Sequence, residues 1–281
     1  MKIAVVGSGI SVIFERRPDV LEPIVELALP GFVAALGLTT LVWLASLVKR
    51  DVSIIDIFWS LGFVMLAWLY RSQVPVESFR QTLVPILVTI WGLRLAIYIL
   101  WRNWGHGEDY RYAAMREKYG GSFPLLSLVI VFWLQGALFW LIGMPLLQVQ
   151  ISRQPSELTW LDILGLALFA VGFFFESVGD YQLARFKAKT ANKGKVMDRG
   201  LWRYTRHPNY FGDATLWWGF GCFALATTGS LWTLISPILM TFLIVKVSGV
   251  TLLEKGLGNT KPKYREYVRR TSAFFPRPPR G

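Results

Sequence analysis

Long apolar segments separated by short polar ones dominate the pattern of this chain. Seven of them are long enough to cross about 30 Å of hydrocarbon as α-helices, and they cover residues 24–48, 52–70, 83–101, 123–148, 158–183, 211–226 and 231–253. The pattern therefore predicts an all-α integral membrane protein with seven transmembrane helices. The sixth segment is short, so we expect its helix to include part of the polar sequence before Phe211. We expect a tight turn at Lys49-Arg50-Asp51.

Basic residues gather on one side of this predicted topology. If the amino terminus lies outside, the inner loops and the carboxyl-terminal tail hold 22 of the 30 Lys and Arg residues, whereas the outer regions hold six. Loops rich in Lys and Arg stay in the cytoplasm when helices insert. The asymmetry therefore favours seven helices and a cytoplasmic carboxyl terminus.

Composition narrows the class of protein further. Hydrophobic residues make up 53% of the chain and include 13 Trp, and the mean hydropathy is +0.42, which exceeds that of ordinary soluble domains. The net charge of +12 is explained by the inner loops, so we expect no nucleic-acid partner. A single cysteine, Cys222, excludes an intramolecular disulfide. Only His106 and His207 are available as imidazole ligands, so we expect no metal site.

The first 22 residues form a segment of their own. Residues 1–11 read like the opening strand and turn of a dinucleotide-binding unit, but Val12 stands where the third glycine would fall, and no helical pattern follows. We therefore interpret residues 1–22 as an accessory amino-terminal segment. Residues 23–281 are expected to form a single membrane domain.

The polar sequence Arg206-His207-Pro208-Asn209-Tyr210-Phe211-Gly212-Asp213 is the main candidate site. Proline is favoured at the first position of a helix, and a helix beginning at Pro208 places Asn209 and Asp213 on one face. Further carboxylates occur among cations in residues 108–112 and on one face of residues 176–187. Carboxylates can bind ribose hydroxyls or an amide, while Lys and Arg bind phosphates. The pattern therefore favours a nucleotide cofactor.

Several short motifs carry a family resemblance. They are Asp180-Tyr181-Gln182-Leu183, Gly200-Leu201-Trp202-Arg203-Tyr204, Asn209-Tyr210-Phe211-Gly212-Asp213, Lys263-Tyr264-Arg265-Glu266-Tyr267 and Phe274-Phe275-Pro276. As a set they resemble the carboxyl-terminal half of the steroid 5α-reductase family, in particular its bacterial membrane branch, over about residues 83–276. Arg-His-Pro-Asn-Tyr alone is shared with isoprenylcysteine carboxyl methyltransferases and with sterol C14 and C7 reductases.

The resemblance implies a seven-helix reductase of the bacterial inner membrane. Its NADPH would lie in a cytoplasm-facing cavity capped by loops, and the basic linker 187–206 favours NADPH over NADH because it can bind a 2′-phosphate. The family's asparagine before the aspartate is here Glu176, and its later arginine is Lys187. The expected cofactor-binding residues are Arg94, Asp109, Arg111, Tyr112, Asp180, Lys187, Arg203, Tyr204, Arg206, His207, Asn209, Asp213, Tyr267 and Arg270.

The implied reaction is reduction of the C=C bond of a Δ4-3-ketosteroid or a similar lipophilic enone. It requires a hydride and an acid that withdraws electron density through the carbonyl oxygen. Asp56 is one candidate, since a buried neutral carboxyl can donate a hydrogen bond, although the family has a glutamine-glutamate pair there. Its alternative role is to pair with Arg94 or Lys246. Tyr98 is the second candidate, with an interhelical hydrogen bond as the alternative.

Three apolar or amide residues complete the expected site. Trp59 and Trp91 flank the polar positions, and Gln135 lies in the fourth segment, so all three are candidates to bind substrate or to pack helices. We expect a monomer that contacts membrane lipid. The alternative functions are an S-adenosylmethionine-dependent membrane methyltransferase and a non-enzymatic lipid-binding protein. The second alternative would leave Asp56 and Arg94 without a purpose.

Overall fold

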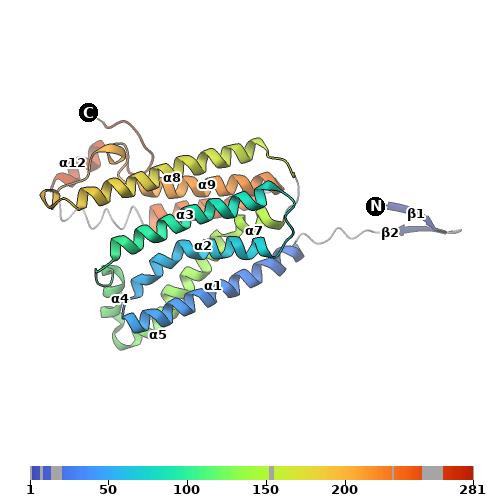
Figure 1. Cartoon of the computed structure of the whole chain (residues 1–281), viewed down its shortest axis with the longest axis horizontal. Helices are drawn as coiled ribbons and strands as arrows, with labels where there is room; N and C mark the ends of the chain where they lie inside the picture. The colour runs from blue at the N-terminus through green and yellow to red at the C-terminus, as the bar shows by residue number, and fades with distance from the viewer. Residues whose placement is uncertain are drawn as a thin grey trace.

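The computed structural model describes residues 2–6, 9–13, 21–151, 155–229, 231–248 and 262–280. Five long helices run side by side along the molecule, and shorter helices cover one of its ends (Figure 1). The long helices are α1 (Leu21–Lys49), α2 (Ile55–Ser72), α3 (Phe79–Asn103), α8 (Trp160–Lys187) and α9 (Pro208–Thr228).

Short helices connect and extend this bundle. The 3₁₀ helices are η1 (Val52–Ile54), η2 (Gly120–Ser122), η4 (Thr190–Asn192), η5 (Gly200–Arg203) and η6 (Leu231–Leu234). Two π-helical turns are η3 (Leu128–Trp133) and η7 (Leu243–Ser248). The short α-helices are α4 (Tyr110–Tyr119), α5 (Phe123–Ser127), α6 (Leu134–Ile142), α7 (Met144–Ile151), α10 (Ile235–Phe242) and α12 (Pro262–Arg270).

Five helical stretches in the described residues are long and apolar enough to cross a membrane. They are Val25–Lys49, Val52–Ser72, Phe79–Asn103, Tyr110–Ile142 and Trp160–Lys187. The expected number was seven. The sixth expected segment lies in α9, which begins at Pro208 as the motif predicted, and the seventh is a shorter apolar helix, Leu231–Val247. The structure thus supports a multi-pass membrane protein with five candidate spans.

The fourth apolar segment differs from the continuous helix that was expected. It contains the π-helical turn η3, and α6 ends at Ile142, with one residue, Gly143, before α7 begins with Met144 and Pro145. A proline interrupts the hydrogen bonds of a helix interior and favours a helix start instead. The break therefore follows from the local sequence Gly143-Met144-Pro145.

The turn expected after the first span is confirmed. Arg50 adopts a positive φ of 53°, and the backbone N–H of Asp51 donates to the carbonyl of Ser46 at 3.1 Å. The Asp51 carboxylate then accepts a hydrogen bond from the backbone N–H of Ser53 at 2.8 Å. Asp51 thereby caps η1, so the chain reverses without leaving the helix end unsatisfied.

The described amino-terminal residues form a β-hairpin, which is a departure from the all-helical prediction. Strand β1 (Lys2–Val6) pairs antiparallel with β2 (Gly9–Ile13), and Lys2 lies opposite Ile13. The β-branched residues Ile3, Val5 and Val6 favour a strand. Because a second strand follows the first, this is not the strand-turn-helix of a dinucleotide-binding unit.

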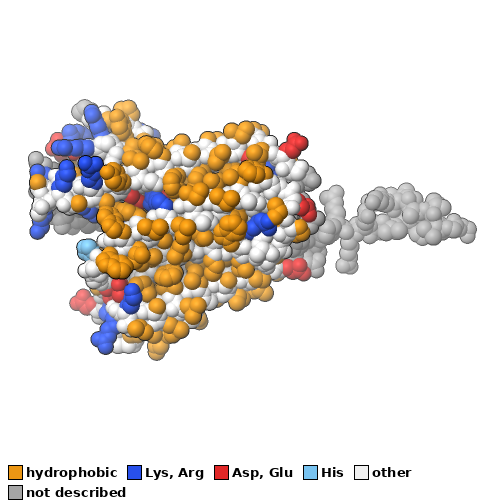
Figure 2. Space-filling view, viewed as in Figure 1, with side chains coloured by type: hydrophobic (Ala, Val, Ile, Leu, Met, Phe, Trp, Pro, Cys, Tyr) orange, Lys and Arg blue, Asp and Glu red, His pale blue; other side chains and the backbone are white. Residues whose placement is uncertain are grey.

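Hydrophobic side chains form both the core and the outer surface of the bundle. The core centres on an aromatic cluster of fully buried rings, in which the centroids of Phe63 and Trp217 lie 4.5 Å apart and those of Trp91 and Trp217 lie 5.6 Å apart. On the outside, hydrophobic side chains cover the middle of the bundle, and many of the Lys and Arg side chains gather at one end (Figure 2). This distribution is what a lipid environment requires.

A buried ion pair joins α3 to α8 at the end opposite those basic residues. Arg80 donates from Nε and Nη2 to the two carboxylate oxygens of Asp162, at 2.5 and 2.6 Å, and both side chains are almost fully buried. Arg80 also donates to the carbonyls of Pro155 and Glu157. Asp162 in turn accepts from the backbone and hydroxyl of Thr159. All charged groups of the pair are therefore satisfied, which is the condition for burying them.

We predict that Arg80→Ala destabilises the protein by about 3–5 kcal/mol, because it leaves the Asp162 carboxylate buried without a counter-charge. Thermal unfolding of the purified protein in detergent measures the loss. The double variant Arg80→Met/Asp162→Leu replaces the pair by apolar groups and should recover most of the stability. An unchanged melting temperature for Arg80→Ala would contradict the assignment.

Candidate functional site

Helices α8 and α9 approach each other closely through glycines. A Cβ atom added to Gly172 would lie 2.5 Å from the carbonyl oxygen of Gly212, and one added to Gly219 would lie 2.6 Å from that of Gly165. These glycines recur every seven residues, so they fall on one face of each helix. The small surfaces allow the two backbones to touch. The contact brings the carboxylates of α8 next to the polar first turns of α9.

Arg94 of α3 lies at the centre of a buried polar cluster. Its Nη1 donates to Asp180 Oδ2 at 2.8 Å, its Nε donates to Ser177 at 3.0 Å, and its Nη2 lies 3.4 Å from Glu176 Oε1. The indole N–H of Trp91 donates to the other oxygen of Glu176 at 3.0 Å. The cluster thus ties α3 to α8 in an apolar bundle, where isolated charges would be costly.

The α9 motif completes this cluster and leaves polar atoms available. Asn209 donates from Nδ2 to Asp180 Oδ1 at 3.1 Å. In the described part of the chain, Asn209 Oδ1, Asp213 Oδ1 and Arg94 Nη2 are buried without a hydrogen bond. A buried polar atom without a partner is costly. Arg94 Nη2 is within ion-pair distance of Glu176, so the two oxygens without a hydrogen bond, Asn209 Oδ1 and Asp213 Oδ1, are the atoms that point to a ligand.

A second polar cluster surrounds Asp56 near the start of α2. Arg111 Nη2 donates to Asp56 Oδ2 at 2.7 Å, and the Tyr112 hydroxyl donates to Asp56 Oδ1 at 2.7 Å. Gln135 of α6 donates to the same Tyr112 hydroxyl at 3.2 Å. Asp56 is therefore paired with Arg111 of α4, and not with Arg94 or Lys246. These contacts fix the Asp56 side chain and position the Tyr112 hydroxyl.

The loop before α4 orients this second cluster. Glu108 accepts from Arg116 at 2.8 Å and from the backbone of Val52 at 2.8 Å, and Asp109 caps α4 and accepts from Arg111 Nε at 2.8 Å. Partial burial opposes ionisation, but these hydrogen bonds outweigh it and hold the pKa of both carboxyl groups, Glu108 and Asp109, below the usual values. Both are therefore charged at neutral pH and hold α4 against η1.

The two clusters face a common cavity of about 400 Å³, which we call the central cavity. Its lining combines polar residues of both clusters with apolar side chains, so a ligand could present both kinds of surface. Trp59, Tyr98 and Gln135 line it, as expected for substrate or catalytic positions. Its lining residues are Asp56, Trp59, Leu95, Tyr98, Ile99, Arg102, Arg111, Tyr112, Gln135, Leu138, Glu176, Asp180, Asn209, Tyr210, Asp213, Met240, Leu243, Ile244 and Val247.

A second cavity of about 580 Å³, the loop cavity, lies between the end of α8, the basic linker and α12. It shares Arg102, Asn209 and Tyr210 with the central cavity. Four lysines of the linker line it, together with the expected residues Arg206, His207 and Tyr267. The lysines are Lys187, Lys189, Lys193 and Lys195. The two cavities therefore meet at the Arg-His-Pro-Asn-Tyr motif. The loop cavity is cationic, and the central cavity is partly polar and partly apolar.

Some expected residues lie outside these two cavities. Arg203 and Arg270 line a separate surface cavity of about 620 Å³ with Arg199 and Arg280. Tyr204 is 44% exposed and lines none of these cavities. Trp91 is fully buried behind Glu176. The linker and the carboxyl-terminal tail contain or adjoin Arg203, Tyr204 and Arg270. The sequence motifs do not show which side chains of these segments face the two cavities and which face outward.

Within the loop cavity, Arg206 and Tyr267 also hold the carboxyl-terminal tail. Arg206 Nη1 donates to the carbonyls of Val268 and Thr271, at 3.1 and 2.5 Å, and the Tyr267 hydroxyl donates to the carbonyl of Trp202. These contacts fasten α12 over the linker. Both residues therefore line the loop cavity and also determine its shape.

Sequence reasoning missed Arg102 and Tyr210 as site residues. Arg102 borders both cavities, and its guanidinium lies 5.7 Å from the ring of Tyr98. The spacing Arg94, Tyr98, Arg102 places all three on one face of α3, so the signal was present. The Tyr210 ring stacks on His207 at 5.6 Å, a contact that only the helix start at Pro208 creates.

The fold and the site define a multi-pass membrane protein with connected polar cavities at one end of its bundle. Residues 42–271 match the family described as "Protein of unknown function (DUF1295)", and the chain belongs to that family. It is also similar to "Uncharacterized protein C594.04c" of Schizosaccharomyces pombe, with 25% identity over 277 residues that cover 88% of this chain and 79% of the relative. No solved structure gives a significant match.

We predict that Gly212→Ala separates α8 from α9 and destabilises the protein by about 1–3 kcal/mol. The new Cβ atom would overlap the backbone nitrogen of Glu176, which cannot move without the helix. Thermal unfolding in detergent measures the effect. Gly37→Ala in α1 is the matched control, since a Cβ there meets nothing within 4 Å and alanine gains up to about 1 kcal/mol in a helix. Equal melting temperatures for the two variants would disprove the close contact.

Proposed function

We propose that this protein is a membrane-embedded, NADPH-dependent reductase of the C=C bond of a lipophilic enone, of the Δ4-3-ketosteroid type. One observation carries the proposal: a lysine-lined cavity opens beside a cavity with carboxylate, amide and apolar walls, and the two share Arg102, Asn209 and Tyr210. The loop cavity suits phosphates. The central cavity suits a ring that carries an amide, next to a lipophilic substrate. The motif resemblance to the steroid 5α-reductase family supports the same reading.

The residues of the two cavities fit a phosphorylated dinucleotide. Lys187, Lys189 and Lys193 offer ammonium groups around the loop cavity for phosphates. At the junction, Asn209 Oδ1 and Asp213 Oδ1 are buried acceptors without a hydrogen bond, and they suit the N–H and O–H donors of a carboxamide or a ribose. Arg94 does not line either cavity and supports this junction indirectly, through its ion pairs with Asp180 and Glu176. When bound, NADPH would supply the hydride.

The apolar wall of the central cavity fits a lipophilic substrate. Leu95, Met240, Leu243 and Ile244 line it together with Trp59, and they come from α3, α10, η7 and α2. Apolar walls exclude water from the reacting carbonyl, which strengthens any hydrogen bond to it. The amphiphilic division of this cavity is therefore the basis for proposing a ketone with a hydrocarbon body.

Hydroxyl groups on the same cavity would stabilise the negative charge that develops on the carbonyl oxygen. Tyr98 lines the cavity and is flanked by the guanidinium groups of Arg94 and Arg102, at 6.0 and 5.7 Å from its ring. Asp56 holds the Tyr112 hydroxyl from the opposite side at 2.7 Å. We assign Tyr98 as the donor to the carbonyl. Asp56 is assigned to supply the proton that the enolate takes up: its protonated carboxyl would pass a proton to Tyr112 as the Tyr112 hydroxyl gives its own proton to the α-carbon.

We predict that NADPH binds at least about tenfold more tightly than NADH, because a charge-assisted hydrogen bond to the 2′-phosphate contributes roughly 1.5–3 kcal/mol. Isothermal titration of the detergent-purified protein with both cofactors measures the difference, which should shrink as salt is added. Equal affinities would remove the assignment of the lysine-lined cavity to the 2′-phosphate. Binding of S-adenosylmethionine in place of both would favour the methyltransferase.

We further predict that two aspartates separate cofactor binding from chemistry. Asp213→Ala should abolish NADPH binding. It should not lower the thermal stability, because it removes a carboxylate that repels those of Glu176 and Asp180. Asp56→Asn should keep the NADPH affinity and slow enone-dependent NADPH oxidation by about 10²-fold or more.

The exposed carboxylate Glu117 on α4 provides the control for both, because Glu117→Ala changes charge outside the cavities. It should leave binding and turnover unchanged. Wild-type NADPH affinity in Asp213→Ala would overturn its role at the cofactor. Full turnover in Asp56→Asn would show that this carboxylate only supports α4.

A further inference from the structure

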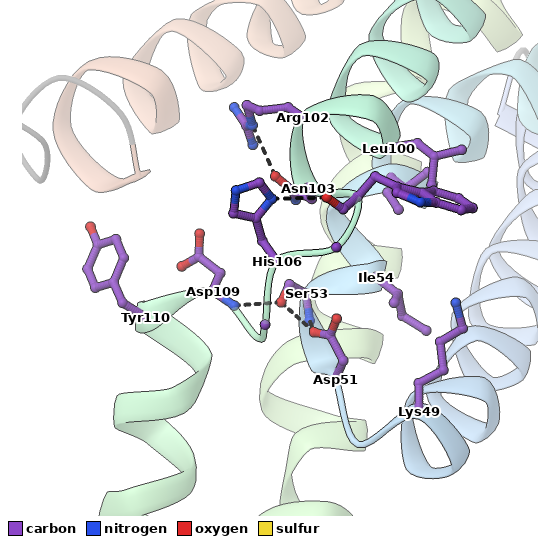
Figure 3. A pocket seen from close by; sticks show the side chains of 14 residues that line it. Lys49, Asp51, Ser53, Ile54, Leu100, Arg102, Asn103, His106, Asp109 and Tyr110 are labelled. Carbon is purple, nitrogen blue, oxygen red and sulfur yellow. Dashed lines mark hydrogen bonds between the residues drawn. The ribbon is translucent and has the colours of Figure 1, made fainter. Parts of the chain in front are cut away.

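We infer that a third cavity, between the turn that joins α1 to η1 and the loop before α4, binds the headgroup of an anionic phospholipid. This turn cavity has a volume of about 500 Å³ (Figure 3). It is lined by Lys49, Asp51, Ser53, Ile54, Ile57, Leu100, Arg102, Asn103, Trp104, Gly105, His106, Gly107, Asp109 and Tyr110. The inference does not depend on the proposed reductase activity.

Two cations of the turn cavity, Lys49 and Arg102, are not held in a close ion pair in the described part of the chain. The ion pairs within 4.0 Å involve other arginines, and neither Lys49 nor Arg102 takes part in one. Arg102 donates to the neighbouring side chain of Asn103, at 3.1 Å, and its guanidinium lies 5.7 Å from the ring of Tyr98. Figure 3 shows that the two cations reach the cavity from two different elements, the end of α1 and the end of α3.

The acidic groups of the cavity are already engaged by the protein. Asp51 accepts from the backbone N–H of Ser53 and from its hydroxyl, while Asp109 accepts from Arg111 and caps α4. Hydrogen bonds hold the pKa of Asp109 below its usual value against the effect of partial burial. The carboxylates therefore serve the fold, and Lys49 and Arg102 are left to attract an anion.

The position of the cavity matches the surface of a bilayer. It lies where candidate spans end at Lys49 and Asn103 and where another begins at Val52. Large aromatic side chains are exposed beside it, with Trp101 at 63% and Trp104 at 74% exposure. Trp and Tyr are enriched at the level of lipid headgroups. The ligand should therefore come from the membrane rather than from solution.

The lining decides which part of a lipid would lie where. The phosphodiester would lie between the Lys49 ammonium and the Arg102 guanidinium, and the polar glycerol would reach Asn103 and the exposed His106. Ile57 and Leu100 form an apolar floor from α2 and α3, which suits the first carbons of an acyl chain. An anionic phospholipid combines these features, whereas free phosphate uses only the cations.

The test uses the full-length protein, purified in detergent and stripped of lipid. Native mass spectrometry counts the bound molecules during titration with phosphatidylglycerol, with phosphatidylcholine as the zwitterionic comparison. We expect one phosphatidylglycerol to bind in preference to phosphatidylcholine. Lys49→Gln should weaken it about fivefold, the contribution of one lysine at a membrane surface. NADPH affinity and melting temperature should not change in this variant.

Arg50→Gln is the matched control, because Arg50 is the adjacent exposed cation and does not line the cavity. It should retain phosphatidylglycerol at the wild-type affinity. Equal weakening by both variants would overturn the inference in favour of diffuse surface charge. Displacement of the lipid by millimolar inorganic phosphate would overturn it in favour of a small-anion site. Equal binding of the two lipids would also overturn it.

Discussion

The buried guanidinium of Arg94 is the interaction on which the rest of the structure depends. An arginine in an apolar bundle is tolerated only when its charge is compensated, and here Asp180 at 2.8 Å and Glu176 at 3.4 Å compensate it. Those two carboxylates lie on α8, and Asn209 of α9 donates to Asp180. The same constraint therefore joins three helices and creates the polar wall of the central cavity.

The two ends of the bundle satisfy their buried charges in different ways. At one end, Arg80 and Asp162 meet each other and nearby carbonyls, so every charged atom has a partner and the end is closed. At the other end, Asn209 Oδ1 and Asp213 Oδ1 lack a hydrogen bond in the described residues. The first arrangement stabilises a fold, and the second favours a ligand.

Much of the architecture could be predicted from local patterns. The apolar segments, the turn at Arg50 and the start of α9 at Pro208 all follow from hydropathy and from the conformational preferences of proline and short polar residues. The break at Gly143 and the hairpin at residues 2–13 were not anticipated as such. In both places an apolar run alone does not decide whether the chain continues as a helix, turns or forms a strand.

The candidate site could be predicted only in part, because spacing along a helix reveals a shared face but not what faces it. Asn209, Asp213 and Asp180, which were expected in one site, all line the central cavity, whereas Arg203 and Arg270 line another cavity. Asp56 was matched with Arg94 or Lys246 as possible structural partners, and its partner is Arg111. That pair requires the loop before α4 to fold back onto α2, a contact between residues 55 positions apart.

The sequence by itself determined which segments are apolar, where cations accumulate and which motif carries the polar side chains, because these depend on residue type and on helical period. Only the tertiary structure decided that α8 and α9 touch through Gly172 and Gly212, and that Arg102 stands between three cavities. The physical reason is that close packing selects partners by shape across the bundle. No linear pattern specifies such shape in advance.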